Sequence, residues 1–373
     1  MSELRATPFH ARTAAANRDN AWITRNGVTL SERFESVEPE VLAARLNVAI
    51  VDISWRWRTR IEGAAAEAFL SRLVTRDAAT LAPGQSFKAL WLSDAGGVRG
   101  AGVIARFGRE SFEIVATATD AEWVASAAGG FDVGLRDVSC ETGGLAVVGP
   151  YASVTLKAAE LATDIEPLAF RKLSWRGLDV TLSRWGEHGG YEIWCEPDDA
   201  ILVWDRLMRA GSEFGIVAAG VAAADVLDLE AGIARPTLDY RPAREGDAAE
   251  PAPGSLGLDT LVDEAHKGFN GRSAYLASQP PRRLVGVEIE SAEPAPFTPL
   301  MLHDKPAGHT LRSAYSPTLR RAIALASVDA VAAVTGATFS LSPPPGFATP
   351  SLRKVAARIV PLPFVSPTAS IGA

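Results

Sequence analysis

The sequence has few cysteines and no long apolar run. Its 373 residues include two cysteines, Cys140 and Cys195, which are too few for a disulfide framework and lack the spacing of a metal or redox motif. No apolar stretch reaches the ~18 residues that a membrane-spanning helix requires. The first 20 residues are polar and lack the apolar core of a signal peptide. We therefore expect a cytoplasmic protein with no membrane partner.

The common sequence signatures of metal, phosphate and nucleophile chemistry are also absent. No two of the histidines lie four residues apart, so we expect no metal site. The glycines between residues 96 and 102 lie in a predicted hairpin and do not open a helix, which argues against a phosphate-binding loop. No G-x-S-x-G motif is present. The net charge of −7 argues against a nucleic-acid partner.

The composition is that of an ordinary folded protein, with 47% hydrophobic and 22% charged residues. Strand pairs alternate with helices as far as residue 280, which predicts an α+β fold with two ferredoxin-like (split-βαβ) domains. We place these domains at residues 1–150 and 151–280. A mostly β domain follows at residues 281–373. Residues 1–36 are predicted to form an irregular N-terminal arm of the first domain.

The stretch from Trp185 to Gly232 holds the most unusual feature of the chain. Its first strand alternates, so that Glu192 and Trp194 fall on the face opposite Tyr191. Burying an unpaired carboxylate in such an apolar strand costs several kcal/mol. A ligand with paired N–H groups would satisfy it, and Trp185 and Trp194 could stack on a flat ligand. The alternative is an amphipathic strand with its acid in water and its tryptophans in the core.

Several short segments resemble, in order and spacing, those of the glycine-cleavage T-protein (aminomethyltransferase) family. The resemblance extends from Thr7 to about Leu341. The segments are Val51–Ser54 (V-D-I-S), the hairpin Leu92–Ile104, Ala146–Pro150 (A-V-V-G-P), Gly190–Ile193 (G-Y-E-I), Leu229–Gly232 (L-E-A-G), Lys267–Gly271 (K-G-F-N-G) and Ser316–Leu325 (S-P-T-L…I-A-L).

This resemblance implies a three-domain ring around a central channel that holds tetrahydrofolate, and it implies that the domain at residues 281–373 is a β-barrel. It also implies that Glu192 accepts hydrogen bonds from the amino and ring N–H groups of the pterin. Trp185 lies where the family places an aromatic residue against the folate. We expect Trp194 and Tyr191 to belong to the same cofactor-binding set.

The chain also departs from the family pattern. Gly100 and Ala101 stand where aminomethyltransferases carry an acidic pair, and Trp55 stands where they carry a histidine. Arginines of the family correspond here to Ala224 and Asp228. The missing acid is shared with the folate-dependent demethylases of the superfamily. We therefore predict a tetrahydrofolate-dependent methyltransferase that demethylates a small organic donor (an aryl ether, a sulfonium compound or a methylamine) to give 5-methyltetrahydrofolate.

The leaving group of such a reaction would need a nearby acid or cation. We predict His188 and Arg99 as the catalytic residues. Arg56 and Arg58, on a basic strand face, are further candidates, and the alternative for all of them is a solvated side chain. The expected partner is the small methyl donor, and no lipoyl carrier protein is expected. Two other functions stay open: an aminomethyltransferase of glycine cleavage, and a non-catalytic folate-binding protein of the iron–sulfur-assembly type.

Overall fold

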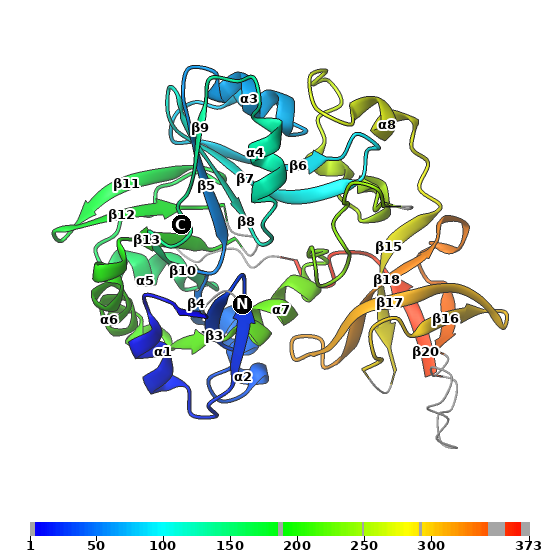
Figure 1. Cartoon of the computed structure of the whole chain (residues 1–373). Coiled ribbons are helices and arrows are strands. Elements are labelled where there is room, and N and C mark those ends of the chain that lie inside the picture. Colours follow the sequence, from blue (N-terminus) through cyan, green and yellow to red (C-terminus); the bar gives the residue numbers. More distant parts are fainter. Residues whose placement is uncertain (1–3, 186–188, 248–249, 291–292, 342–354, 367–373) are drawn as a thin grey trace. The chain divides into compact units, whose positions relative to one another are not determined.

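The computed structural model describes residues 4–185, 189–247, 250–290, 293–341 and 355–366 (Figure 1). The chain divides into two compact units, residues 4–89 with 101–225, and residues 90–100 with 226–366. The predicted domain boundaries at residues 150 and 280 stay a prediction. None of the described helices is long and apolar enough to cross a membrane.

The first unit contains a six-stranded sheet with the order β11-β12-β13-β10-β4-β14. Two of its strands precede residue 150 and four follow it, so backbone hydrogen bonds join both sides of that position. Only β14 and β4 pair in parallel. The strands are β4 (Val48–Asp52), β10 (Gly143–Val148), β11 (Phe170–Trp175), β12 (Leu178–Ser183), β13 (Tyr191–Cys195) and β14 (Ile216–Ala219).

One face of this sheet carries the main apolar core. Alternate residues such as Ile50, Val147 and Ile193 point to this face, as the period of a β-strand requires. They pack with the apolar sides of α5 (Ala152–Ala158) and α6 (Ala200–Ala210), which lie against the sheet in Figure 1. The next residues along each strand point to the other face, and there the polar site is found.

A five-stranded sheet with the order β6-β7-β8-β5-β9 holds the residues that meet this second face. Its central pair, β5 and β8, is antiparallel, with Arg60 opposite Glu113. The elements here are β5 (Trp57–Glu62), α3 (Ala66–Leu73), β6 (Ser86–Leu92), β7 (Val98–Gly108), β8 (Ser111–Ala116), α4 (Ala121–Ala127) and β9 (Gly134–Asp137).

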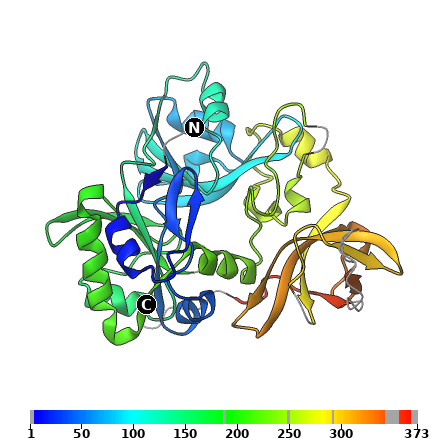
Figure 2. The same cartoon turned by 60° about the horizontal axis from the view of Figure 1, so that its bottom comes forward.

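The prediction of an irregular N-terminal arm is wrong. Residues 5–31 form a small sheet, β1-β3-β2, and a helix, followed by α2 (blue in Figure 2). The overlooked signal is Asn26-Gly27, whose φ angles of 46° and 73° form the tight turn between β2 and β3. The elements are β1 (Arg5–Ala6), α1 (His10–Ala16), β2 (Trp22–Arg25), β3 (Val28–Ser31) and α2 (Val37–Leu46).

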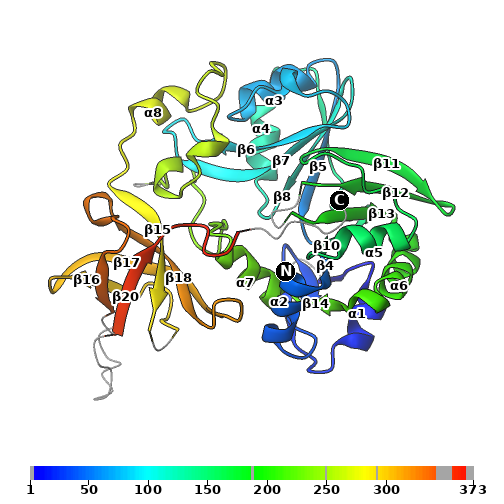
Figure 3. The same cartoon turned by 180° about the vertical axis from the view of Figure 1, so that it is seen from behind.

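The second unit contains the predicted β-barrel, which closes in the order β15-β18-β17-β16-β19-β20 (yellow to red in Figure 3). The α+β fold with a C-terminal barrel is therefore confirmed. The elements are α7 (Val221–Glu230), α8 (Arg272–Ala277), β15 (Arg282–Ile289), β16 (Pro299–Leu302), β17 (Lys305–Ser316), β18 (Arg321–Asp329), β19 (Thr338–Leu341) and β20 (Val355–Val360).

Two of the family-like segments meet at the end of α7. The hydroxyl of Ser316 donates a 2.6 Å hydrogen bond to Oε1 of Glu230, and both residues are fully buried. The L-E-A-G and S-P-T-L segments are thus joined by one hydrogen bond to a carboxylate that has no access to water.

We expect Ser316→Ala to lower the free energy of unfolding by about 1–3 kcal/mol, because the substitution leaves a buried carboxylate oxygen without this donor. Chemical denaturation would measure the loss. Ser340→Ala, at a half-buried serine of β19, is the control. Equal stability of the two variants would contradict a structural role for the hydrogen bond.

Candidate functional site

Glu192 lies in the middle of β13, and only 1% of it is exposed. Its register partners on the two neighbouring strands are Ala146 and Ser183, both of which have small side chains. Space for Trp194, two residues on, comes from Gly144, where a Cβ atom would lie 2.5 Å from the indole. The sheet therefore accommodates one acid and one large indole side by side. The alternative reading, an amphipathic strand with Glu192 in water, is excluded because the residue is buried.

The buried carboxylate is paired by donors from the protein. Oε1 accepts a 2.6 Å hydrogen bond from Nη1 of Arg56. Oε2 accepts hydrogen bonds from the indole nitrogens of Trp185 and Trp194, the latter at 3.4 Å. An ionised carboxylate offers about four acceptor positions. Within the part of the chain that the structure describes, these three donors leave one position unfilled, on Oε1.

Arg56 comes from the turn that connects β4 of one sheet to β5 of the other. Its backbone N–H donates to the carbonyl of Ile53, 3.1 Å away, which closes the turn. Its side chain is 17% exposed, more than any other group on the Glu192 carboxylate. Its Nε is buried and, among the described residues, has no hydrogen-bond partner.

The two tryptophans contact the carboxylate with their N–H edges, while neighbours cover their faces. The guanidinium carbon of Arg58 lies 4.4 Å from the centre of the Trp194 ring. The ring of Trp185 lies 5.4 Å from that of Phe170. Both indoles are at least 98% buried. The structure thus brings Trp185, Trp194 and Glu192 together, with the indoles acting as hydrogen-bond donors and their faces covered by the protein. Their role as cofactor-binding residues stays a prediction.

A second buried acid, Glu113 on β8, neutralises the basic face of β5. Nη2 of Arg58 and Nη2 of Arg60 both donate to it, the latter over 2.6 Å, and its side chain is fully buried. Arg58 also donates to the hydroxyl of Thr142, 2.7 Å away. Sequence reasoning missed Glu113, although an acid inside the apolar run of β8 is the same signal that singled out Glu192.

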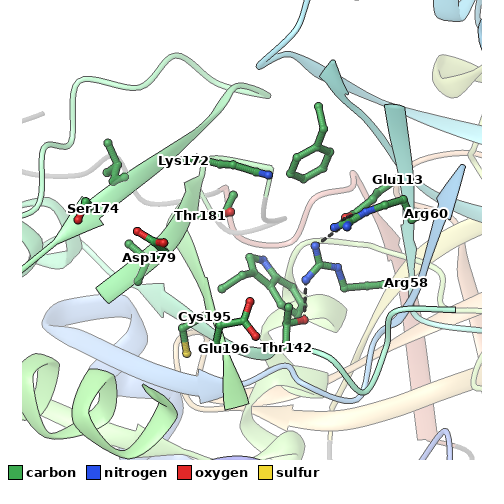
Figure 4. A pocket seen from close by; sticks show the side chains of 14 residues that line it. Arg58, Arg60, Glu113, Thr142, Lys172, Ser174, Asp179, Thr181, Cys195 and Glu196 are labelled. Carbon is green, nitrogen blue, oxygen red and sulfur yellow. Dashed lines mark hydrogen bonds and ion pairs between the residues drawn. The ribbon is translucent and has the colours of Figure 1, made fainter. Parts of the chain in front are cut away.

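A pocket of about 450 Å³ opens beside this network (Figure 4). Lys172 reaches into it from β11, opposite Arg60 on β5. Glu192 does not line the pocket, but Trp194 does. The lining residues are Arg58, Arg60, Phe107, Glu113, Thr142, Lys172, Leu173, Ser174, Asp179, Val180, Thr181, Trp194, Cys195 and Glu196.

The other predicted site residues are Tyr191, Arg99 and His188. Tyr191 is fully buried in the apolar core on the opposite face of β13, and its hydroxyl donates to the carbonyl of Thr163 over 3.2 Å. Arg99 is a buried residue of β7, in the second unit. His188 lies outside the described residues. The catalytic roles of Arg99 and His188 stay predictions.

Position 100, where the sequence has no acid, has no space for a side chain. A Cβ atom on Gly100 would lie 2.1 Å from Cζ2 of Trp91, a contact that no structure tolerates. Trp91 is fully buried and has no room to withdraw. The indole of Trp91 therefore occupies the space that any side chain at position 100 needs.

Glu113→Gln is expected to lower the free energy of unfolding by about 3–5 kcal/mol, because it leaves Arg58 buried without a counter-ion. Thermal and chemical denaturation would measure this loss. Glu62→Gln, at an exposed acid of the adjacent strand β5, supplies the control. Similar stability of both variants would show that Glu113 does not hold the two arginines.

Gly100→Asp should lower the free energy of unfolding by about 1–3 kcal/mol through overpacking against Trp91. The double variant Gly100→Asp/Trp91→Leu should lose less than the sum of the two single variants. Gly134→Asp, where the nearest atom lies 3.8 Å from the added Cβ, is the control. Strict additivity in this double-mutant cycle would contradict the steric conflict.

Models of two protein-domain families match the chain. The GCVT N-terminal domain matches residues 9–249, and the glycine cleavage T-protein C-terminal barrel domain matches residues 282–366. The second match covers the closed barrel described above. Together the two matches account for most of the chain.

Curated relatives and a solved structure agree with these matches. An aminomethyltransferase of Geobacillus thermodenitrificans is 30% identical over 345 residues, 88% of this chain and 90% of that protein. One of Bacillus pumilus is 29% identical over 347 residues, 89% and 93% of the two chains. The crystal structure of glycine cleavage system aminomethyltransferase T from Bartonella henselae has a TM-score of 0.87 at 23% identity, covering 99% of this chain and all of that one.

These comparisons overturn two predictions. The chain was expected to be a demethylase, but relatives that cover most of its length are aminomethyltransferases. That prediction depended on one missing acid, and a single local departure weighs less than similarity over the whole chain. The prediction that no lipoyl carrier protein takes part is also wrong. It assumed that the chain does not act in glycine cleavage, whereas its relatives are aminomethyltransferases.

Proposed function

This chain belongs to the glycine cleavage T-protein family of tetrahydrofolate-dependent transferases, and from that premise we propose that it is an aminomethyltransferase whose Glu192 binds the pterin. In this reaction a lipoyl carrier protein presents an S-aminomethyl group. The carbon forms bonds to N5 and N10 of tetrahydrofolate as its C–S and C–N bonds break. The two N–H protons leave with ammonia and the freed thiol.

The buried carboxylate of Glu192 is the observation that carries this proposal. A pterin offers an amino group and a ring N–H side by side, and a carboxylate is the planar acceptor that matches such a pair. Glu192 is held rigidly on a central strand, so its acceptor direction is fixed. Among the described residues its Oε1 carries one donor, Arg56, and has one acceptor position left, so displacement of Arg56 opens the second position that a pair of N–H groups needs. The residues present therefore fit the folate.

The roles of the neighbouring residues follow from their contacts. Trp185 and Trp194 keep Oε2 in place and exclude water from it, since both indoles are buried. Arg56 supplies a guanidinium within hydrogen-bond distance of Oε1, which pairs the buried carboxylate with a cation. Because Gly100 has no side chain, we infer that positioning of the carrier and the folate makes the larger contribution to the rate here.

Glu192→Gln is expected to weaken tetrahydrofolate binding by about 10- to 100-fold, because hydrogen bonds to a charged group contribute about 1.5–3 kcal/mol. Isothermal titration calorimetry of the full chain would measure this. Glu122→Gln, at an exposed acid of α4 that does not line the pocket, is the control. Unchanged affinity in Glu192→Gln would overturn the pterin role of Glu192.

The reaction itself is tested by ammonia release from an aminomethyl-loaded lipoyl carrier protein in the presence of tetrahydrofolate. We expect one ammonia for each methylene group transferred. Folate binding without ammonia release would overturn the transferase proposal and leave a folate-binding protein without turnover.

A further inference from the structure

Arg56 is the one group on the Glu192 carboxylate that has both an unused donor and room to move. Its Nε has no partner among the described residues, and its side chain is partly exposed. The other two donors, Trp185 and Trp194, are packed on all sides and at least 98% buried. A ligand that approaches Glu192 therefore displaces Arg56 before it displaces either indole.

The hydrogen-bonding edge of a pterin has three positions in a row. Its 2-amino group and N3–H are donors, and its 4-oxo oxygen is an acceptor. A carboxylate satisfies the two donors but supplies no donor for the oxygen, and a buried acceptor without a donor costs about 1–3 kcal/mol. A guanidinium beside the carboxylate supplies the missing donor.

We propose that Arg56 determines the specificity of this site for 4-oxo pterins. When the ligand binds, Arg56 withdraws a hydrogen bond from Oε1 of Glu192 and donates to the 4-oxo oxygen, while Glu192 accepts from the 2-amino group and N3–H. In the free protein Arg56 and Glu192 pair with each other. In the complex Glu192 is the acceptor and Arg56 the donor for one edge of the ligand. This inference rests on the proposed function, since it requires the pterin at Glu192.

Two ligands that differ at the edge facing Arg56 separate this role from simple competition. Tetrahydrofolate carries the 4-oxo acceptor and a hydrogen on N3, whereas its 2,4-diamino analogue carries an amino donor at position 4 and no hydrogen on N3. The difference at N3 is the same for every variant at position 56, so a change in the ratio of the two affinities reports the contact at position 4. Arg56 repels that donor, because both groups present N–H. The wild-type chain should therefore prefer the 4-oxo compound, and the ratio of the two dissociation constants measures the preference.

Arg56→Met should lower the affinity for tetrahydrofolate by about tenfold and leave the affinity for the 2,4-diamino compound unchanged or raised. The dissociation constant of the 2,4-diamino compound divided by that of tetrahydrofolate should therefore fall by about tenfold or more. Arg56→Lys, which keeps one charged donor, should restore part of the preference. Arg136→Met, at an exposed arginine of β9, is the control and should leave the ratio unchanged. Calorimetry with both ligands gives all the constants.

The outcomes distinguish this inference from the proposed function on which it rests. If Arg56→Met binds both ligands more tightly by the same factor, Arg56 only competes for Glu192 and the inference is overturned. An equal loss for both ligands would show a structural role and overturns it too. If neither ligand binds the wild-type chain, the proposed folate site itself is refuted, and the inference fails with it.

Discussion

The structure of the site depends on one constraint: the carboxylate of Glu192 is buried in the centre of a sheet and has to be paired. An unpaired charge there would cost more free energy than a small domain has to spare. The protein meets this demand with a guanidinium and two indole N–H groups. Arg56 comes from the turn between the two sheets of the first unit, so pairing the acid also fixes where those sheets meet.

Glu113, on the neighbouring sheet, is a second buried acid that is paired by donors from the protein. It is fully buried and holds Arg58 and Arg60, and Arg58 in turn covers the face of Trp194. The two buried acids are therefore linked through one arginine and one indole. Such a network leaves few alternative side-chain arrangements, because moving any member exposes a charge to a medium of low dielectric constant. This rigidity fixes the direction in which the Glu192 carboxylate accepts hydrogen bonds.

The departures from the family pattern have different physical origins. At position 100 the change is steric, because the indole of Trp91 fills the space of a side chain. At position 228 an acid replaces an arginine, and Asp228 forms a two-bond ion pair with Arg235 at 2.6 and 2.7 Å. These two altered positions are thus integrated into their surroundings. The fold of the family is kept while the charges around the hairpin and α7 are rearranged.

Much of the fold and part of the site could be predicted from the sequence. The alternation around Glu192 correctly assigned it to the face opposite Tyr191, and the strand pattern after residue 280 correctly indicated a mostly β domain, because both signals are periodic and local. Closure of that domain into a barrel was implied by the family resemblance. The N-terminal sheet was missed because its strands are only two to four residues long and show little alternation.

The partners of the buried acids were decided only by the tertiary structure. Arg56 and Glu192 are 136 residues apart, and Arg58 and Glu113 are 55 apart. The sequence showed that an acid in an apolar strand needs donors, since that follows from the cost of burying a charge. It could not show that the donors come from the chain itself, because strand order and the turn between the sheets determine which side chains meet.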